Sequence, residues 1–196
     1  MKRIITIGRE FGAGGGTLGR RLAKELGIEY YDRDIILATA KASAHLTPEQ
    51  VRQWDERVPK EFGFTQSLFN FYSKPLGEEL WNAQVHAIRE LADKESCVIV
   101  GRNADYILKE YDHCLRVFAH AGFQWRVNRM AGKMPGVPLE QVASDVRQAD
   151  KARKKSCEHY TKTRYRDAAN YDLCINTEKL GIDRAVKFVL EAAENL

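Results

Sequence analysis

Six consecutive small residues have the composition of an anion-binding loop: Gly12, Ala13, Gly14, Gly15, Gly16 and Thr17. The preceding residues 3–7 are mostly β-branched, as in a short strand, and residues 17–26 place apolar side chains at helical spacing. Backbone N–H groups between a strand and a helix N-terminus can bind an anion, and glycines let the backbone approach it closely. The sequence therefore predicts a phosphate-binding loop here.

One pattern that fits these glycines is the dinucleotide fingerprint G-x-G-x-x-G. Gly14, Gly16 and Gly19 satisfy it, and Asp32 follows near the position expected for a ribose contact. A dinucleotide-binding reductase is therefore one alternative. The fingerprint normally starts directly after its strand, however, whereas six residues separate Ile7 from Gly14. The intervening residues favour a loop that wraps around phosphates.

The second pattern is the P-loop template G-x-x-x-x-G-K-[ST], in which the loop holds the phosphates of a nucleoside triphosphate. With Gly14 at the second glycine, Arg9 stands at the first glycine and Gly15 at the lysine. The template lysine reaches the β- and γ-phosphates, so a different cation would have to take over its role. Thr17 retains a hydroxyl that can orient a magnesium ion.

Arginines further along the chain are candidates for binding phosphate. Arg102 follows the apolar residues 97–100, which places it at the carboxyl end of a predicted buried strand. A guanidinium there can hold a phosphate with two parallel hydrogen bonds. Arg126 and Arg129 are three residues apart and share a helix face, which by itself is typical of a solvated surface.

A basic stretch covers residues 150–166. In the helix predicted from Leu139, Asp150, Arg153 and Lys154 lie on one face. An arginine-bearing helix that closes over phosphates would neutralise charge on a transferred group and exclude water. A solvated helix and a nucleic-acid patch are the alternative interpretations.

The elements that must position these residues alternate between strands and helices. Strands are predicted at residues 3–7, 28–31, 97–100, 115–119 and 172–176, and helices at about 17–26, 47–59, 75–93 and from 139. This order predicts an α/β fold, with a five-stranded parallel sheet covered by helices on both faces and ligands at the carboxyl ends of the strands. Residues 60–74 have no clear period and are interpreted as an irregular insertion.

The composition limits the partners. The chain has 196 residues, 44% of them hydrophobic, and a net charge of +4, which suits a small anionic ligand and does not require nucleic acid. The apolar runs are too short for a membrane span or a secretory leader, so a cytoplasmic protein is expected. The four cysteines and five histidines show no metal-ligand spacing. The apolar face of the helix after Pro75 suits either a core helix or a homo-oligomer.

The ordered set of motifs resembles the cytidylate kinase-like family of P-loop nucleoside-monophosphate kinases. The segments that carry the resemblance are residues 4–16, 31–34, 100–106, 126–129, 150–153 and 170–177. The resemblance implies a P-loop NTPase fold in one domain over residues 1–196. It also implies a helical acceptor-binding insertion at about 45–95 and an arginine-bearing lid at about 133–166.

The resemblance also implies an activity: transfer of the γ-phosphoryl group of ATP, with Mg²⁺, to a nucleoside monophosphate such as CMP or another small acceptor. Residues 12–17 would cradle the donor phosphates, with Thr17 toward the metal. Asp32 and Arg33 would contact the acceptor, and Arg102 would hold its phosphate. The residues implied for the catalytic machinery are Arg129, Asp150 and Arg153.

Gly15 departs from the true cytidylate kinases, which carry the P-loop lysine at that position. The chain resembles more closely a related branch of cytidylate kinase-like proteins that also lacks this lysine. A competent kinase would need a compensating cation, and the candidates are Arg9, Arg20 and Arg153. A nucleotide-binding regulatory module that has lost turnover together with the lysine is the alternative function.

Overall fold

The computed structural model describes residues 2–32 and 78–194. The predicted helix at 47–59, the irregular insertion at 60–74 and Arg33 lie outside the described residues. Of the predicted acceptor-binding insertion at about 45–95, only the last helix, α5 (Glu78–Lys94), is described in full.

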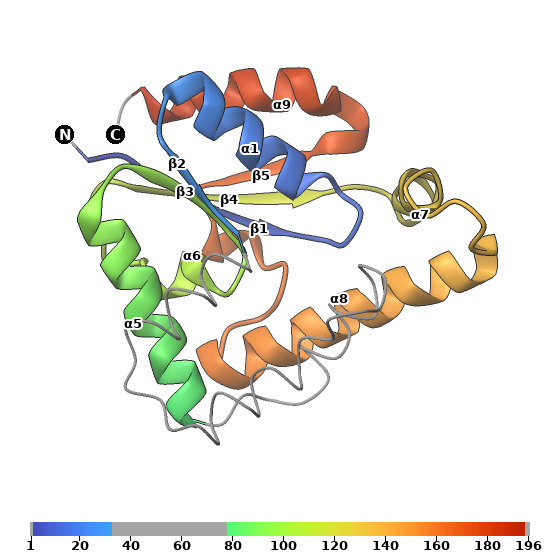
Figure 1. Ribbon diagram of the computed structural model, residues 1–196, viewed down its shortest axis with the longest axis horizontal. Coiled ribbons are helices and arrows are strands. Elements are labelled where there is room, and N and C mark those ends of the chain that lie inside the picture. The colour runs from blue at the N-terminus through green and yellow to red at the C-terminus, as the bar shows by residue number, and fades with distance from the viewer. Residues whose placement is uncertain (1, 33–77, 195–196) are drawn as a thin grey trace.

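Five parallel strands form one sheet, as the alternating pattern predicts (Figure 1). The strands are β1 (Ile4–Arg9), β2 (Glu29–Tyr31), β3 (Cys97–Val100), β4 (Cys114–His120) and β5 (Leu173–Asn176). Their bounds lie within two residues of the predicted ones. Four successive buried apolar residues make β3 a strand covered on both faces.

The spatial order of the strands is β2-β3-β1-β4-β5, so β1 lies between β3 and β4. In the dinucleotide-binding order, the first strand instead pairs with the second. Ile7 is in register with Val100 on one side and Val117 on the other, so the loops after β1 and β3 leave the sheet side by side. Ligands of open α/β sheets bind at such a point, where the chain leaves neighbouring strands in opposite directions.

Helices cover both faces of the sheet and make a three-layer fold (Figure 1). On one face, α1 (Gly15–Leu26) packs beside α9 (Thr177–Ala193). Their buried side chains share one apolar cluster with the sheet, for example Leu22 of α1 and Val186 of α9. The other face carries α5 and the short α6 (Ala104–Ile107).

Two further helices follow β4 and extend the second face (Figure 1). The helix α7 (Phe123–Ala131) packs on α8 (Leu139–Thr161), the long helix that was predicted from Leu139. Val127 of α7 and Val146 of α8 are buried in their common apolar cluster. A 3₁₀ turn, η1 (Ala168–Asn170), precedes β5.

The apolar face of α5 packs inside the chain, which is one of its two sequence interpretations. Ala87, Ile88 and Ala92 on this face are buried. Among the described residues, no helix combines the length and apolar character needed to cross a membrane.

Candidate functional site

The glycine-rich loop joins the central strand β1 to α1. Gly12 and Gly14 adopt φ angles of 81° and 86°, in the left-handed region that favours glycine. A Cβ atom on Gly12 would lie 2.9 Å from the carbonyl oxygen of Arg126, so the loop has no room for a side chain there. Gly14 is the N-cap of α1, and the first N–H groups of a helix have no acceptor within the helix. They are available to an anion.

Gly19, the third glycine of the dinucleotide fingerprint, has a packing role. A Cβ atom at this position would lie 2.7 Å from Cγ2 of Val100 on β3. The glycine therefore lets α1 pack closely on the sheet. The close packing of α1 explains why residue 19 is glycine, and the strand order differs from that of dinucleotide-binding folds. The G-x-G-x-x-G pattern is therefore explained without a bound dinucleotide.

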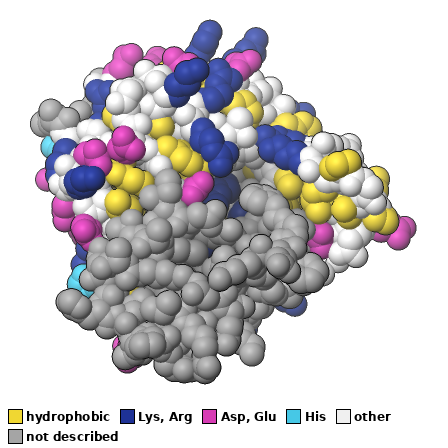
Figure 2. Space-filling view, viewed as in Figure 1, with side chains coloured by type: hydrophobic (Ala, Val, Ile, Leu, Met, Phe, Trp, Pro, Cys, Tyr) yellow, Lys and Arg dark blue, Asp and Glu magenta, His cyan; other side chains and the backbone are white. Residues whose placement is uncertain are grey.

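A pocket lies over the loop and contains about 800 Å³ of empty space, part of it continuous with solvent. Five cationic residues line it together with the loop: Arg9, Arg20, Arg129, Lys133 and Arg153. Figure 2 shows Lys and Arg side chains gathered at the centre of the visible face of the molecule. The pocket therefore suits a strongly anionic ligand.

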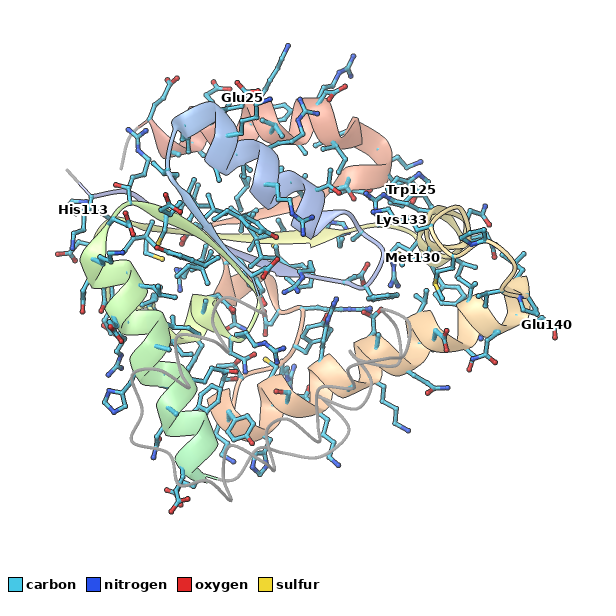
Figure 3. The ribbon with its side chains drawn as sticks, in the orientation of Figure 1. Glu25, His113, Trp125, Met130, Lys133 and Glu140 are labelled. Carbon is cyan, nitrogen blue, oxygen red and sulfur yellow. The ribbon has the colours of Figure 1, made fainter. Side chains whose placement is uncertain are left out.

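Arg129, Met130 and Lys133 form the part of the pocket wall that comes from α7 and the turn after it. Figure 3 labels Met130 and Lys133 in this part of the molecule. Arg129 donates from Nη2 to Oγ1 of Thr17 (3.1 Å) and from Nη1 to the Gly12 carbonyl (3.4 Å). Burial lowers the pKa of Arg129. The pKa of Lys133 is also lowered, first by burial and then by the like charges of Arg129 and Arg20. An anion placed among these side chains would relieve their repulsion.

The oxygen atoms near the loop fit a magnesium ion that is held largely by substrate phosphates. Such ions use one or two protein oxygens and keep their remaining positions for phosphates and water. The Thr17 hydroxyl lines the pocket and could supply one of those oxygens. No group of three His, Cys, Asp or Glu side chains forms a metal site within residues 2–32 and 78–194.

Arg102 lies directly after β3, as predicted, in a smaller pocket beside the first. Its side chain is buried, and its carbonyl oxygen accepts a hydrogen bond from Nε2 of Gln84 (3.3 Å). Asp105 and Tyr171 line the same pocket. Burial raises the pKa of Asp105, while a side-chain hydrogen bond with Tyr171 and nearby cations, including Arg9, oppose that shift.

Arg153 of α8 lines both pockets, so the predicted lid helix reaches the loop. Its Nη1 donates to the carbonyl oxygen of Arg9 (3.1 Å), and its guanidinium lies 5.4 Å from the centre of the Phe11 ring. Nε of Arg153 is buried and has no hydrogen-bond partner among the described residues. The side chain is therefore held in place and still has one unused buried donor.

Asp150 belongs to a buried network beneath the loop and lines neither of these two pockets. Its Oδ1 accepts the backbone N–H of Phe11 (2.7 Å), and its Oδ2 accepts from Nη1 of Arg126 (2.6 Å) and Nη2 of Arg166 (3.1 Å). The carboxylate therefore fixes the loop and α7 relative to α8.

Sequence reasoning missed the rest of this network. Arg126, interpreted above as part of a solvated face, is only 4% exposed. Its Nε contacts Oε2 of Glu10 (3.1 Å), and Glu10 Oε1 contacts Nη2 of Arg166 (2.6 Å). These residues are far apart in the chain and have no motif spacing. The one local signal is the acidic residue directly after the central strand, which needs a partner if it is buried.

The structure brings most of the predicted site residues together. The main pocket is lined by Gly12, Gly14, Gly15, Gly16, Thr17, Asp32, Arg129 and Arg153, and the neighbouring pocket by Arg102 and Arg153. The Ala13 carbonyl oxygen accepts a hydrogen bond from Oγ1 of Thr177 at the start of α9 (2.6 Å). Asp150 lies behind the loop, and Arg33 is outside the described residues.

Comparisons with known proteins show the family and the fold of this chain. The family model described as the cytidylate kinase-like family matches residues 4–179. A cytidylate kinase from Thermococcus sibiricus is 25% identical over 98% of this chain and 89% of its own length. The fold is similar to that of an uncharacterized protein from Eubacterium ventriosum, with a TM-score of 0.77, 24% identity and full coverage of both chains. It is also similar to shikimate kinase from Bacteroides thetaiotaomicron, with a TM-score of 0.57, 16% identity and 98% coverage of both.

Proposed function

The chain belongs to the cytidylate kinase-like family, and we propose that it transfers the γ-phosphoryl group of ATP to a nucleoside monophosphate such as CMP. The observation that carries this proposal is a pair of adjacent pockets at the carboxyl end of the sheet. One lies over the glycine loop and the other contains Arg102, and Arg9 and Arg153 line both. Two phosphorylated molecules can therefore bind with shared cations between them.

In the proposed reaction, an oxygen of the acceptor phosphate forms a bond to the γ-phosphorus of ATP. The bond from that phosphorus to the β–γ bridging oxygen breaks, and ADP leaves with the electron pair. No proton has to be removed when the acceptor phosphate is a dianion. The work of the protein is therefore to align the two phosphates and to neutralise their charge.

The proposed role of each residue follows from its place in the two pockets. The loop N–H groups and Arg129 would hold the donor phosphates, Arg102 the acceptor phosphate, and Arg153 the region between them. Asp32 lines the donor pocket at the end of β2 and is proposed to contact the acceptor nucleoside. A magnesium ion held by Thr17 and the phosphates would supply further positive charge to the transferred group.

A coupled assay for ADP release, with ATP, Mg²⁺ and a panel of nucleoside monophosphates and other small acceptors, tests the proposal. We expect acceptor-dependent turnover, and Arg102→Ala should raise the KM for the acceptor by about 10- to 100-fold, because a charge-assisted phosphate contact is lost. The affinity for ATP should change little.

Arg116→Ala is the control, because Arg116 is also partly buried and bonded to Asp172 but lines neither pocket. It should lower thermal stability and leave the KM for the acceptor unchanged. Tight ATP binding without turnover on any acceptor would contradict the proposal and support the nucleotide-binding regulatory module.

A further inference from the structure

Arg9 and Gly15, which stand at the first glycine and at the lysine of the P-loop template, lie directly against each other. Arg9 ends β1, and its side chain passes over the first residue of α1. A Cβ atom on Gly15 would lie 2.8 Å from Cβ, 3.1 Å from Cγ and 3.2 Å from Cδ of Arg9. Side-chain carbons do not approach each other so closely, so position 15 has no room for a lysine while Arg9 is present.

A second glycine makes room for the charged end of the same side chain. Gly101 follows β3 with a φ of 83°, and a Cβ atom there would overlap Nη1 of Arg9 and lie 2.8 Å from its Cζ. The guanidinium therefore lies at the carboxyl ends of β1 and β3, beside Arg102. It borders both the pocket over the loop and the pocket of the proposed acceptor phosphate.

We propose that Arg9 is the phosphate-directed cation of this site and that it replaces the missing P-loop lysine. The proposal rests on the proposed function, because it assigns Arg9 to the donor phosphates of that reaction. A guanidinium can bind a phosphate through two parallel hydrogen bonds, which a lysine cannot do. Arg9 is then a catalytic residue that contacts the transferred group.

The other cations of the pocket are placed differently. Arg20 is 63% exposed in its side chain and pairs with Asp32 at 3.6 Å. Arg129 approaches from α7 and contacts Thr17. Arg153 donates to the backbone carbonyl of Arg9, so it helps to fix the strand end that carries the proposed cation. Among these four arginines, Arg9 is the one whose side chain lies against the position of the template lysine.

The contact between Arg9 and Gly15 also explains why the first glycine and the lysine of the template are replaced together. Even an alanine at position 9 would keep a Cβ atom 2.8 Å from the place that a Cβ atom on residue 15 would take. A lysine at position 15 therefore requires a glycine at position 9, which is the combination in the template. This chain has the reverse arrangement, with the cationic side chain at position 9 and the glycine at position 15.

The exchange of side chains between positions 9 and 15 can be tested by moving the cation from position 9 to position 15. The four proteins are the wild type, Arg9→Gly, Gly15→Lys and the double variant Arg9→Gly/Gly15→Lys. Calorimetric titration with inorganic tripolyphosphate measures the phosphate contacts without any assumption about the acceptor. The coupled assay measures phosphoryl transfer separately.

We expect Arg9→Gly to weaken tripolyphosphate binding by about 10- to 100-fold. Its turnover should fall by about 10²- to 10³-fold. Gly15→Lys should also be impaired, because the new side chain collides with Arg9. The double variant should recover binding and turnover relative to either single variant. If tripolyphosphate binding changes in this way across the four proteins but the wild type transfers no phosphoryl group, the proposed function fails. Arg9 is then still assigned as the phosphate-binding cation.

Two outcomes would overturn the assignment: unchanged tripolyphosphate affinity in Arg9→Gly, or a double variant no better than Arg9→Gly. Arg9→Gln gives a second measure, since it removes the charge and keeps most of the side chain at the end of the strand. Arg164→Gln removes the same charge at an exposed position that lines neither pocket, and it should bind like the wild type. Thermal melting of each variant confirms that it is folded.

Discussion

At the scale of single residues, the pocket is defined by an excess of positive charge. Partial burial lowers the pKa of Lys133, and repulsion from Arg129 and Arg20 lowers it further. A lysine is protonated below its pKa, and a bound anion stabilises the protonated form. Polyphosphate binding must therefore raise the pKa of Lys133 and couple binding to proton uptake.

The affinity for tripolyphosphate should accordingly fall as the pH rises from neutral through the lowered pKa of free Lys133, because its favourable charge is lost. Lys133→Met should bind more weakly at neutral pH and show a flatter decline on the alkaline side. Calorimetric titrations in two buffers of different ionisation enthalpy measure the protons taken up. Lys151→Met, an exposed α8 position that lines neither pocket, should keep the wild-type profile, and an unchanged slope in Lys133→Met would contradict the coupling.

At the scale of elements, the loop is held by its neighbours as well as by its own glycines. The hydroxyl of Thr177, the first residue of α9, is fully buried and lies 2.6 Å from the carbonyl oxygen of Ala13 and 3.1 Å from that of His120. Asn176 caps the same helix by accepting the N–H groups of residues 178 and 179. The start of α9 thus fixes one peptide of the phosphate loop and the end of β4.

Replacing Thr177 with valine should test this tether, since valine keeps the shape and removes the donor. We expect a loss of about 1–3 kcal/mol in the free energy of unfolding, because buried carbonyl groups lose a partner. Tripolyphosphate affinity should fall as well, because the peptide after Ala13 is no longer fixed. Thr177→Ser keeps the hydroxyl and should retain the affinity. Urea denaturation and calorimetry measure the two effects, and a destabilised variant with wild-type affinity would show that the loop holds its shape without α9.

At the scale of the whole molecule, the sequence predicts the sheet and the loop well, because both depend on local patterns. Residues 97–100 are apolar throughout and residues 12–17 are glycine-rich, and each pattern has few structural solutions. The contacts between residues of the site depend instead on tertiary structure. The contact of Arg9 with Gly101, and the pairing of Glu10 with Arg126, depend on strand order and helix packing. No spacing along the chain encodes them.

The buried network joins the end of β1 to α7 and α8, which carry Arg129 and Arg153. Removing Arg126 leaves the buried carboxylates of Glu10 and Asp150 with Arg166 as their remaining ion-pair partner among residues 2–32 and 78–194. Arg126→Met should therefore reduce the free energy of unfolding by about 3–5 kcal/mol, as expected when one partner of a buried ion pair is lost.

Adding Glu10→Gln to Arg126→Met should restore part of this loss, because one uncompensated charge disappears. A double-mutant cycle by urea denaturation measures that coupling. Arg147→Met on α8 is the control for the loss of a guanidinium alone, since the exposed Arg147 guanidinium lies 4.5 Å from the centre of the Phe123 ring. It should cost about 1 kcal/mol or less. If Arg126→Met were as mild as this control, the network would not hold the two helices to the loop. Arg129 of α7 and Arg153 of α8 would then be positioned by apolar packing alone.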